Sequence, residues 1–153
     1  MRLLLYMGKS AVSKAIEWQT RSPYSHVAVE LDDGRIVEAW HKQGVRIIDH
    51  GHEGHSMGTP IEYYSIGVPF SHAPVEAFLL NQVGKGYDWR GVWRFVSRRD
   101  QPVNDRWFCS ELCVAAFAQG GLHLLKGNPS IFSPRDVSIS PVIVYESTHT
   151  HEE

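Results

Sequence analysis

The sequence contains little cysteine and no long hydrophobic run, and its charges nearly balance. Two cysteines in 153 residues are too few for a disulfide framework, so a disulfide-stapled fold is excluded and a reducing, cytoplasmic setting is expected. A formal net charge of −2 argues against attraction to nucleic acid or to an anionic membrane. The apolar run in MRLLLYMGKS is interrupted by Lys9, which predicts a buried first strand rather than a signal peptide or a transmembrane segment.

The composition is that of an ordinary globular protein, with 42% hydrophobic and 21% charged residues. We expect residues 1–153 to form one domain, because this length supports one substantial core. The chain shows no repeat, no low-complexity segment, no Gly-rich phosphate motif and no nucleic-acid-binding module. Nucleic acid is therefore not an expected partner. The sequence contains one basic cluster, made up of Arg90, Arg94, Arg98 and Arg99. Such a cluster is typical of a solvated face beside a loop.

Hydrophobic patterns predict a mixture of strands and helices, hence an α+β fold. Period-two alternation predicts strands at the N-terminus and over 25–31, 35–40, 44–50, 61–70 and 141–146. Helical spacing predicts helices over 11–20, from 72 to just before Gly84 or Gly86, and over 109–119, the first of them capped by Ser10. Residues 88–100 are typical of a short helix or an irregular turn. The pair Asp33-Gly34 predicts a tight hairpin turn between the strands on either side of it.

Both cysteines lie in the stretch DRWFCSELCVAAFAQGG. Cys109 comes where the helical pattern begins, and Cys113 follows one turn later on the apolar face. The partial positive charge of a helix N-terminus lowers the pKa of a thiol there and favours the nucleophilic thiolate. Cys109 is therefore the only plausible nucleophile, with a packing role as its alternative. Cys113 is predicted to be a small buried hydrophobe.

A histidine and a carboxylate lie on the upstream hairpin. His26 begins one strand, and Glu38 lies on the returning strand. If Asp33 and Gly34 form the turn, Glu38 pairs with Val29 rather than with His26. A shift of one residue in the pairing would move the Glu38 side chain to the other face of the sheet. The sequence thus permits a cysteine–histidine–acid set of thiolate, proton shuttle and orienting group. A half-exposed strand histidine is the alternative.

Four motifs in this order, SPYSHVAVEL, VEAW, GKGYDW and WFCSELC, resemble the circularly permuted NlpC/P60 papain-like hydrolases. This is the YiiX and YebB-type group of bacteria and phages. In that group the histidine lies near the N-terminus and the cysteine opens a late helix, the reverse of the ordinary NlpC/P60 order. This chain has the reversed order, and the match runs from about Ala15 to Phe117. The resemblance implies a permuted papain-like α+β fold, in which a small antiparallel sheet packs against helices.

The resemblance also implies residue roles. It makes Cys109 the nucleophile, His26 the general base and later acid, and Glu38 the group that holds the imidazole. Tyr87 matches a tyrosine near the site that helps to hold the oxyanion, with the backbone N–H of Cys109 as a second donor. The implied activity is that of a cysteine amidase or peptidase, which hydrolyses a peptide-amide or acyl substrate through a thioester and needs no cofactor.

Two alternatives stay open. One is a lipid-directed acyltransferase or esterase that uses the same triad. The other is a catalytically silent binding module on the same fold.

Histidines crowd the segment that includes HGHEGH, namely His41, His50, His52 and His55. Glycine-rich loops can bring imidazoles together around zinc, but these spacings match neither H-E-x-x-H nor a paired C-x-x-C frame. We therefore predict no metal, and a polar, mobile loop over or beside the cleft. The five tryptophans are expected in the core and the cleft wall rather than in a carbohydrate-stacking platform.

Overall fold

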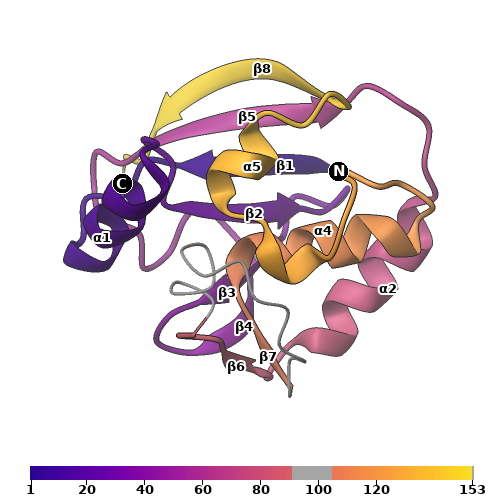
Figure 1. Ribbon diagram of the computed structural model, residues 1–153, viewed down its shortest axis with the longest axis horizontal. Coiled ribbons are helices and arrows are strands. Elements are labelled where there is room, and N and C mark those ends of the chain that lie inside the picture. Colours follow the sequence, from indigo (N-terminus) through magenta and orange to yellow (C-terminus); the bar gives the residue numbers. More distant parts are fainter. Residues whose placement is uncertain (91–104, 153) are drawn as a thin grey trace.

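The computed structural model describes residues 1–90 and 105–152. An antiparallel sheet with the strand order β4-β3-β2-β1-β5-β8 runs through the molecule (Figure 1). Its strands are β1 (Arg2–Tyr6), β2 (His26–Glu30), β3 (Ile36–Trp40), β4 (Gly44–Ile48), β5 (Pro60–Ile66) and β8 (Ile143–Thr150). The predicted antiparallel sheet is thereby confirmed. Other predicted features lie outside the described residues, and these are Trp93, Arg94, Arg98, Arg99 and most of the segment 88–100.

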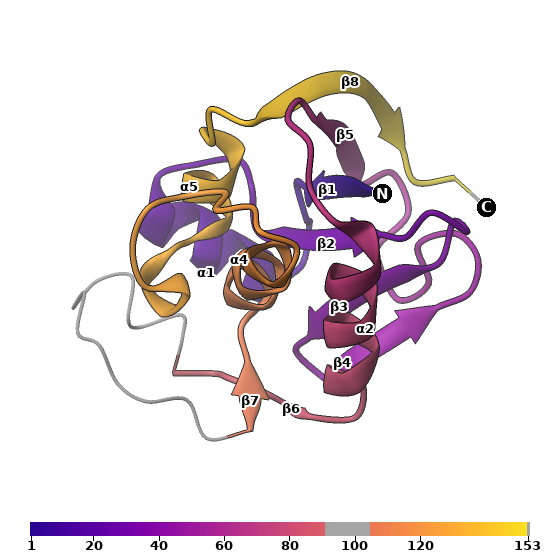
Figure 2. The same cartoon turned by 90° about the vertical axis from the view of Figure 1, so that its right-hand side faces the viewer.

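Helices cover one face of the sheet. The described helices are α1 (Ala11–Thr20), α2 (His72–Gln82), α4 (Cys109–Gln119) and α5 (Pro134–Ser138), with a 3-10 turn η1 (Pro129–Ile131). Figure 2 shows α4 and α2 side by side against β2 and β3. The predicted cap of α1 is confirmed, because the Ser10 hydroxyl accepts a hydrogen bond from the Ser13 amide at 3.1 Å. In the described part of the chain, no helix has both the length and the apolar character to cross a membrane.

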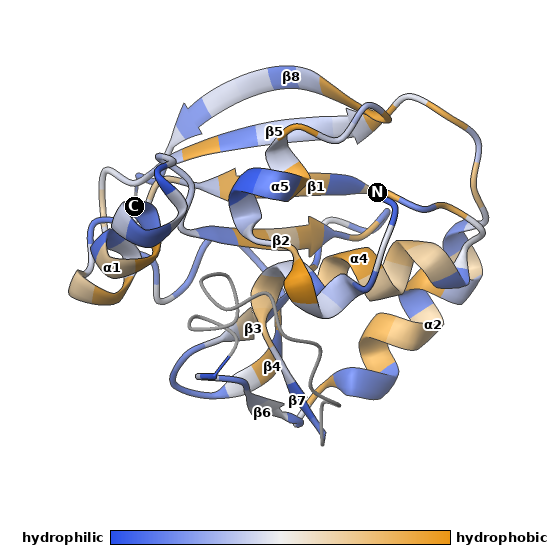
Figure 3. Ribbon diagram, viewed as in Figure 1, coloured by the Kyte–Doolittle hydropathy of each residue, from blue (hydrophilic) through white to orange (hydrophobic). Residues whose placement is uncertain are grey.

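The central strands are buried on both faces. Leu3 and Leu5 of β1 pack under the helices, whereas Leu4 and Tyr6 belong to a smaller cluster on the opposite face. Each fully buried aliphatic side chain contributes about 1.5–3 kcal/mol. A strand covered on both faces is apolar at successive positions, which explains the uninterrupted run in β1. Hydrophobic residues also concentrate along α2 and α4, whereas α5 is hydrophilic (Figure 3).

The β2–β3 hairpin differs from the predicted one by a single residue. Its loop contains three residues, Asp32–Gly34, and the glycine that ends it has a φ of 88°. Val29 pairs with Val37, so the predicted pairing of Val29 with Glu38 is wrong. Because side chains alternate along a strand, this shift of one residue puts Glu38 on the same face as His26.

A two-stranded parallel sheet leads into α4. It joins β6 (Gly86–Tyr87) to β7 (Arg106–Trp107). The sequence did not predict these strands, because two residues are too few to show a period. They position Tyr87 beside the start of α4, with its ring centroid 5.8 Å from that of Phe108.

Candidate active site

The first turn of α4 contains Cys109. The Cys109 side chain is fully buried. The backbone amide of Phe108, just before it, donates to the Glu111 carboxylate at 3.4 Å. The Ser110 hydroxyl donates to the carbonyl of Phe132, which fixes this turn against the segment after η1. The helix therefore begins where the sequence predicts, and its start is held from two sides.

His26 connects Cys109 to the sheet. Its Nε2 lies 2.7 Å from Oε2 of Glu38, and its ring also interacts with the Cys109 side chain. Burial lowers the pKa of His26, but the negative charge of Glu38 and the hydrogen bonds with Cys109 and Glu38 outweigh burial and raise the pKa to about 10. At neutral pH the imidazole is therefore protonated, the charge state that pairs with a thiolate.

Glu38 is fully buried and receives four hydrogen bonds. Oε2 accepts from His26 and, at 3.0 Å, from Nε2 of His55. Oε1 accepts from Nε and Nη2 of Arg46 at 2.8 and 2.6 Å. Burial raises the pKa of Glu38, but the charge and hydrogen bonds of His26, and then those of His55, hold it well below its ordinary value. Donors on both oxygens keep this buried carboxylate ionised and fixed in direction.

Tyr87 borders the same site. It is buried and, with His26 and Trp40, lines a cavity of about 30 Å³. Burial and then the negative charge of Cys109 raise the pKa of Tyr87 well above its ordinary value, so its hydroxyl remains a donor. The structure thus brings together all four residues that the sequence singles out.

A larger cavity of about 230 Å³ adjoins His26 on the side of the histidine-rich loop. Its lining includes Trp40 and His55 beside His26, and Lys9 and Lys42 at its edge. The site is therefore open to a ligand from this side.

The histidine-rich loop contributes contacts to the site that the sequence did not predict residue by residue. The His55 ring stacks on Tyr6, with centroids 4.1 Å apart and planes at 12°. His52 lies between two phenols, with Nδ1 3.0 Å from the Tyr6 hydroxyl and Nε2 2.9 Å from that of Tyr63. The loop therefore lies beside the cleft as predicted, and these two histidines make specific contacts there. No local pattern marks them, because Tyr6, Tyr63 and Glu38 come from three other strands.

The tryptophans follow the expectation only in part. Trp40 packs against His26 with ring centroids 5.6 Å apart and lines both cavities of the site, so it forms cleft wall as predicted. Trp89 packs against Tyr87 at 5.2 Å but is 48% exposed. Trp18 is 84% exposed on α1, and the predicted burial is wrong for it.

Three side chains of the site offer metal-ligand atoms. Nε2 of His26, Oε2 of Glu38 and Nε2 of His55 lie within 4.8 Å of one another. Two histidines and a glutamate are a known donor set of catalytic zinc, so the residues fit a divalent cation by their chemistry. The separations of 2.7 and 3.0 Å from the carboxylate oxygen are also those of hydrogen bonds. The same cluster therefore suits either a hydrogen-bonded triad with an additional imidazole or a metal ion.

The architecture is an α+β fold with the histidine on an early strand and the cysteine at the start of a late helix. The chain superposes on the crystal structure of the metalloprotein yiiX from Escherichia coli O157:H7, DUF1105, with a TM-score of 0.70. The match covers 97% of this chain and 96% of that chain at 19% sequence identity. It confirms the predicted fold and the likeness to the YiiX group at the level of fold. No protein-family model and no curated protein matches the chain.

Proposed function

We propose that the protein is a thiol hydrolase of the amidase or peptidase type. The observation that carries the proposal is the continuous set Cys109–His26–Glu38, in which a buried carboxylate holds an imidazolium against a thiol at a helix start. This arrangement has the parts that acyl transfer needs: a nucleophile, a proton carrier and an orienting group.

The reaction begins with attack of the Cys109 thiolate on the substrate carbonyl carbon. The new C–S bond moves the carbonyl electron pair to oxygen, and the Tyr87 hydroxyl and the Cys109 backbone N–H donate to that oxyanion. As the C–N bond breaks, the His26 imidazolium gives its proton to the leaving amine. The neutral imidazole then takes a proton from water as the water attacks the thioester, and Cys109 leaves as thiolate.

Glu38 acts through His26 and not on the substrate. Its hydrogen bond directs the ring and stabilises the charged imidazole, as the acid of a triad does. Arg46 and His55 in turn hold Glu38 at both oxygens.

The pH dependence of alkylation by iodoacetamide, read by mass spectrometry at each cysteine, tests the proposal. In the wild type we expect Cys109 to react well below pH 8 while Cys113 stays inert. In His26→Ala the advantage of Cys109 should disappear. If both thiols react alike, with midpoints near the free-cysteine value of about 8.5, the thiol-hydrolase proposal is contradicted. Comparison of amide and ester substrates then separates an amidase from a lipid-directed acyltransferase or esterase.

A metal site is the second candidate function, because the ligand atoms of His26, Glu38 and His55 converge and the matched YiiX structure is that of a metalloprotein. A divalent cation held there would polarise a carbonyl or lower the pKa of a bound water. Coordination would also occupy Nε2 of His26 and weaken its bond to Glu38.

Zinc content after equilibrium dialysis, measured by mass spectrometry, tests this candidate. Retention of about one zinc per chain, lost in His55→Ala and kept in His50→Ala, is the expected result for a metal site. His50 is a matched control, because it is an exposed histidine of the same loop. Failure of the wild type to retain zinc contradicts the metal function.

A further inference from the structure

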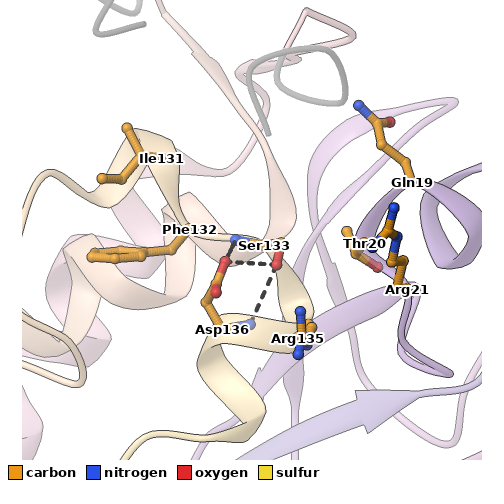
Figure 4. Close-up of a pocket in the computed structure, with 8 residues that line it drawn as sticks. All are labelled: Gln19, Thr20, Arg21, Ile131, Phe132, Ser133, Arg135 and Asp136. Carbon is orange, nitrogen blue, oxygen red and sulfur yellow. Dashed lines mark hydrogen bonds between the residues drawn. The ribbon is translucent and has the colours of Figure 1, made fainter. Parts of the chain in front are cut away.

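A second cavity lies outside the site described above. It has a volume of about 310 Å³ and separates the end of α1 from the start of α5. Figure 4 shows Gln19, Thr20 and Arg21 on one wall and the segment 131–136 on the other. This volume is at the lower end of the range for small-molecule sites, which suits a small group or one end of a longer ligand.

The lining of the cavity contains two arginines and one carboxylate, and so carries a net positive charge. Arg21 and Arg135 are both exposed at its rim, and neither forms an ion pair with a described residue. The carboxylate in the lining, Asp136, instead accepts hydrogen bonds from the amide and hydroxyl of Ser133 at 2.8 and 2.7 Å. Three other arginines of the described chain each bind a carboxylate, namely Arg2, Arg35 and Arg46.

Two features of the α1 wall also point to an anionic ligand. Nε2 of Gln19 is a buried donor with no hydrogen-bond partner in the described structure, and an unmet buried donor costs about 1–3 kcal/mol. Arg21 ends the helix with a φ of 53°, a left-handed conformation that favours glycine or asparagine. Arg21 therefore occupies a position at which the backbone conformation favours glycine or asparagine over arginine.

Both walls of the cavity continue into the candidate active site. The Thr20 hydroxyl donates to the carbonyl of Ile16 at 2.8 Å, and Ile16 lines the small cavity beside His26. On the other wall, Phe132 accepts the hydrogen bond of Ser110, the neighbour of Cys109. Thr20 of the arginine cavity is thus one helical turn along α1 from Ile16 of the small cavity.

We propose that the arginine cavity binds a carboxylate of the substrate, and this inference rests on the thiol-hydrolase function proposed above. The guanidinium groups of Arg21 and Arg135 pair with the carboxylate. Planar guanidinium matches carboxylate with two parallel hydrogen bonds. The Phe132 side chain provides an apolar wall for the atoms that carry the carboxylate. The substrate class is therefore an acidic acyl compound, such as a short peptide with a carboxylate near the scissile amide.

Binding to full-length Cys109→Ala protein tests the inference without turnover. The probes are N-acetylalanine, which has a carboxylate, and N-acetylalaninamide, which has the same size and no charge. Titrations followed by NMR chemical shifts should show the acid binding at least about tenfold more tightly than the amide. Shift changes should centre on residues 19–21 and 131–136.

Substitutions in the same protein locate the binding site. Arg21→Asn and Arg135→Gln should each weaken binding of the acid about tenfold. Arg21→Asn tolerates the left-handed backbone, so lost binding will not reflect a lost fold. Arg106→Gln is the matched control, because Arg106 is exposed on β7 and does not line the cavity. The inference is overturned if acid and amide bind equally well, or if neither Arg21→Asn nor Arg135→Gln changes binding of the acid.

The two proposals fail separately. Carboxylate binding that depends on Arg21, together with equal alkylation of both cysteines, contradicts the thiol-hydrolase proposal and supports the cavity as a carboxylate site. A reactive Cys109 together with no preference for the acid overturns the carboxylate inference alone.

Discussion

The first and second turns of α4 each contain a fully buried cysteine of the same core cluster, yet their polar contacts differ. Cys109 in the first turn contacts the polar set of His26 and Glu38 through the histidine. Cys113 in the second turn lies among the apolar residues of the core. Burial and then the negative charge of Cys109 raise the pKa of Cys113 well above its ordinary value.

The two thiols therefore do not differ in solvent exposure, but they differ in their neighbouring side chains. The field of a helix N-terminus acts within the first turn, and it reaches Cys109 more strongly than Cys113. A larger difference comes from β2, because His26 forms a hydrogen bond with Cys109, whereas burial is the main influence on Cys113. The predictions below use this contrast, from the largest expected effect to the smallest.

Replacing the first-turn cysteine should abolish the chemistry. We expect Cys109→Ala to lower turnover of an activated acyl ester, p-nitrophenyl acetate, by about 10⁴-fold or more, because loss of a nucleophile removes the covalent pathway. Release of nitrophenolate measures the rate. Cys113→Ala is the matched control and should keep turnover of wild-type order. Equal losses in the two variants would erase the distinction between the two turns.

The second largest effect is expected when the Glu38 carboxylate, which is hydrogen-bonded to His26, is neutralised. Glu38→Gln removes the charge that favours the imidazolium, so turnover of the same ester should fall by about 10²–10⁴-fold and the pKa of His26 should fall. The change also leaves Arg46 and His55 without their buried anion, which costs about 3–5 kcal/mol of folding free energy.

Urea unfolding and an NMR titration of His26 measure these two effects. Glu76→Gln is a comparison at a half-exposed ion pair on α2, where less than about 1 kcal/mol is expected. A pKa of His26 that stays near 10 in Glu38→Gln would contradict the assigned role of Glu38.

The surroundings of the first turn should make stability depend on pH. The pKa of His26 is raised from 6.5 to about 10 in the folded protein, so its stabilising contribution is complete below pH 6.5 and is lost as the pH rises through 10. The loss should amount to roughly 5 kcal/mol. Thermal unfolding between pH 6.5 and 10 should show this slope in the wild type and in Cys113→Ala. His26→Gln should flatten it, and an unchanged slope in that variant would assign the pH dependence to other groups.

The smallest effect is expected in the second turn. Cys113→Ala deletes one buried sulfur from the apolar core, which should cost about 1 kcal/mol by cavity formation. Chemical denaturation measures this change at neutral pH. Cys113→Ser should cost more than Cys113→Ala, because it buries a hydroxyl without a prepared partner. A stabilising serine would show that the second turn is less apolar than the structure indicates.

Local patterns in the sequence were enough to predict much of this molecule. The cap at Ser10, the start of α4 at Cys109 and the alternation in β2 and β3 depend on neighbours a few residues away, and they form where predicted. The sequence also singled out Cys109, His26, Glu38 and Tyr87, the first three from their types and order and Tyr87 from the family motif. A hydrophobic period and a capping side chain act within one element, so they can be read before the fold is known.

Only the tertiary structure decided how the site is assembled. The hairpin closes with three residues rather than two, and that choice alone puts Glu38 on the face of His26. The added donors, Arg46 and His55, come from β4 and from a loop that the sequence marks only as polar. A buried carboxylate must find such donors wherever the fold brings them. These contacts join residues far apart in the chain, and no periodicity records them.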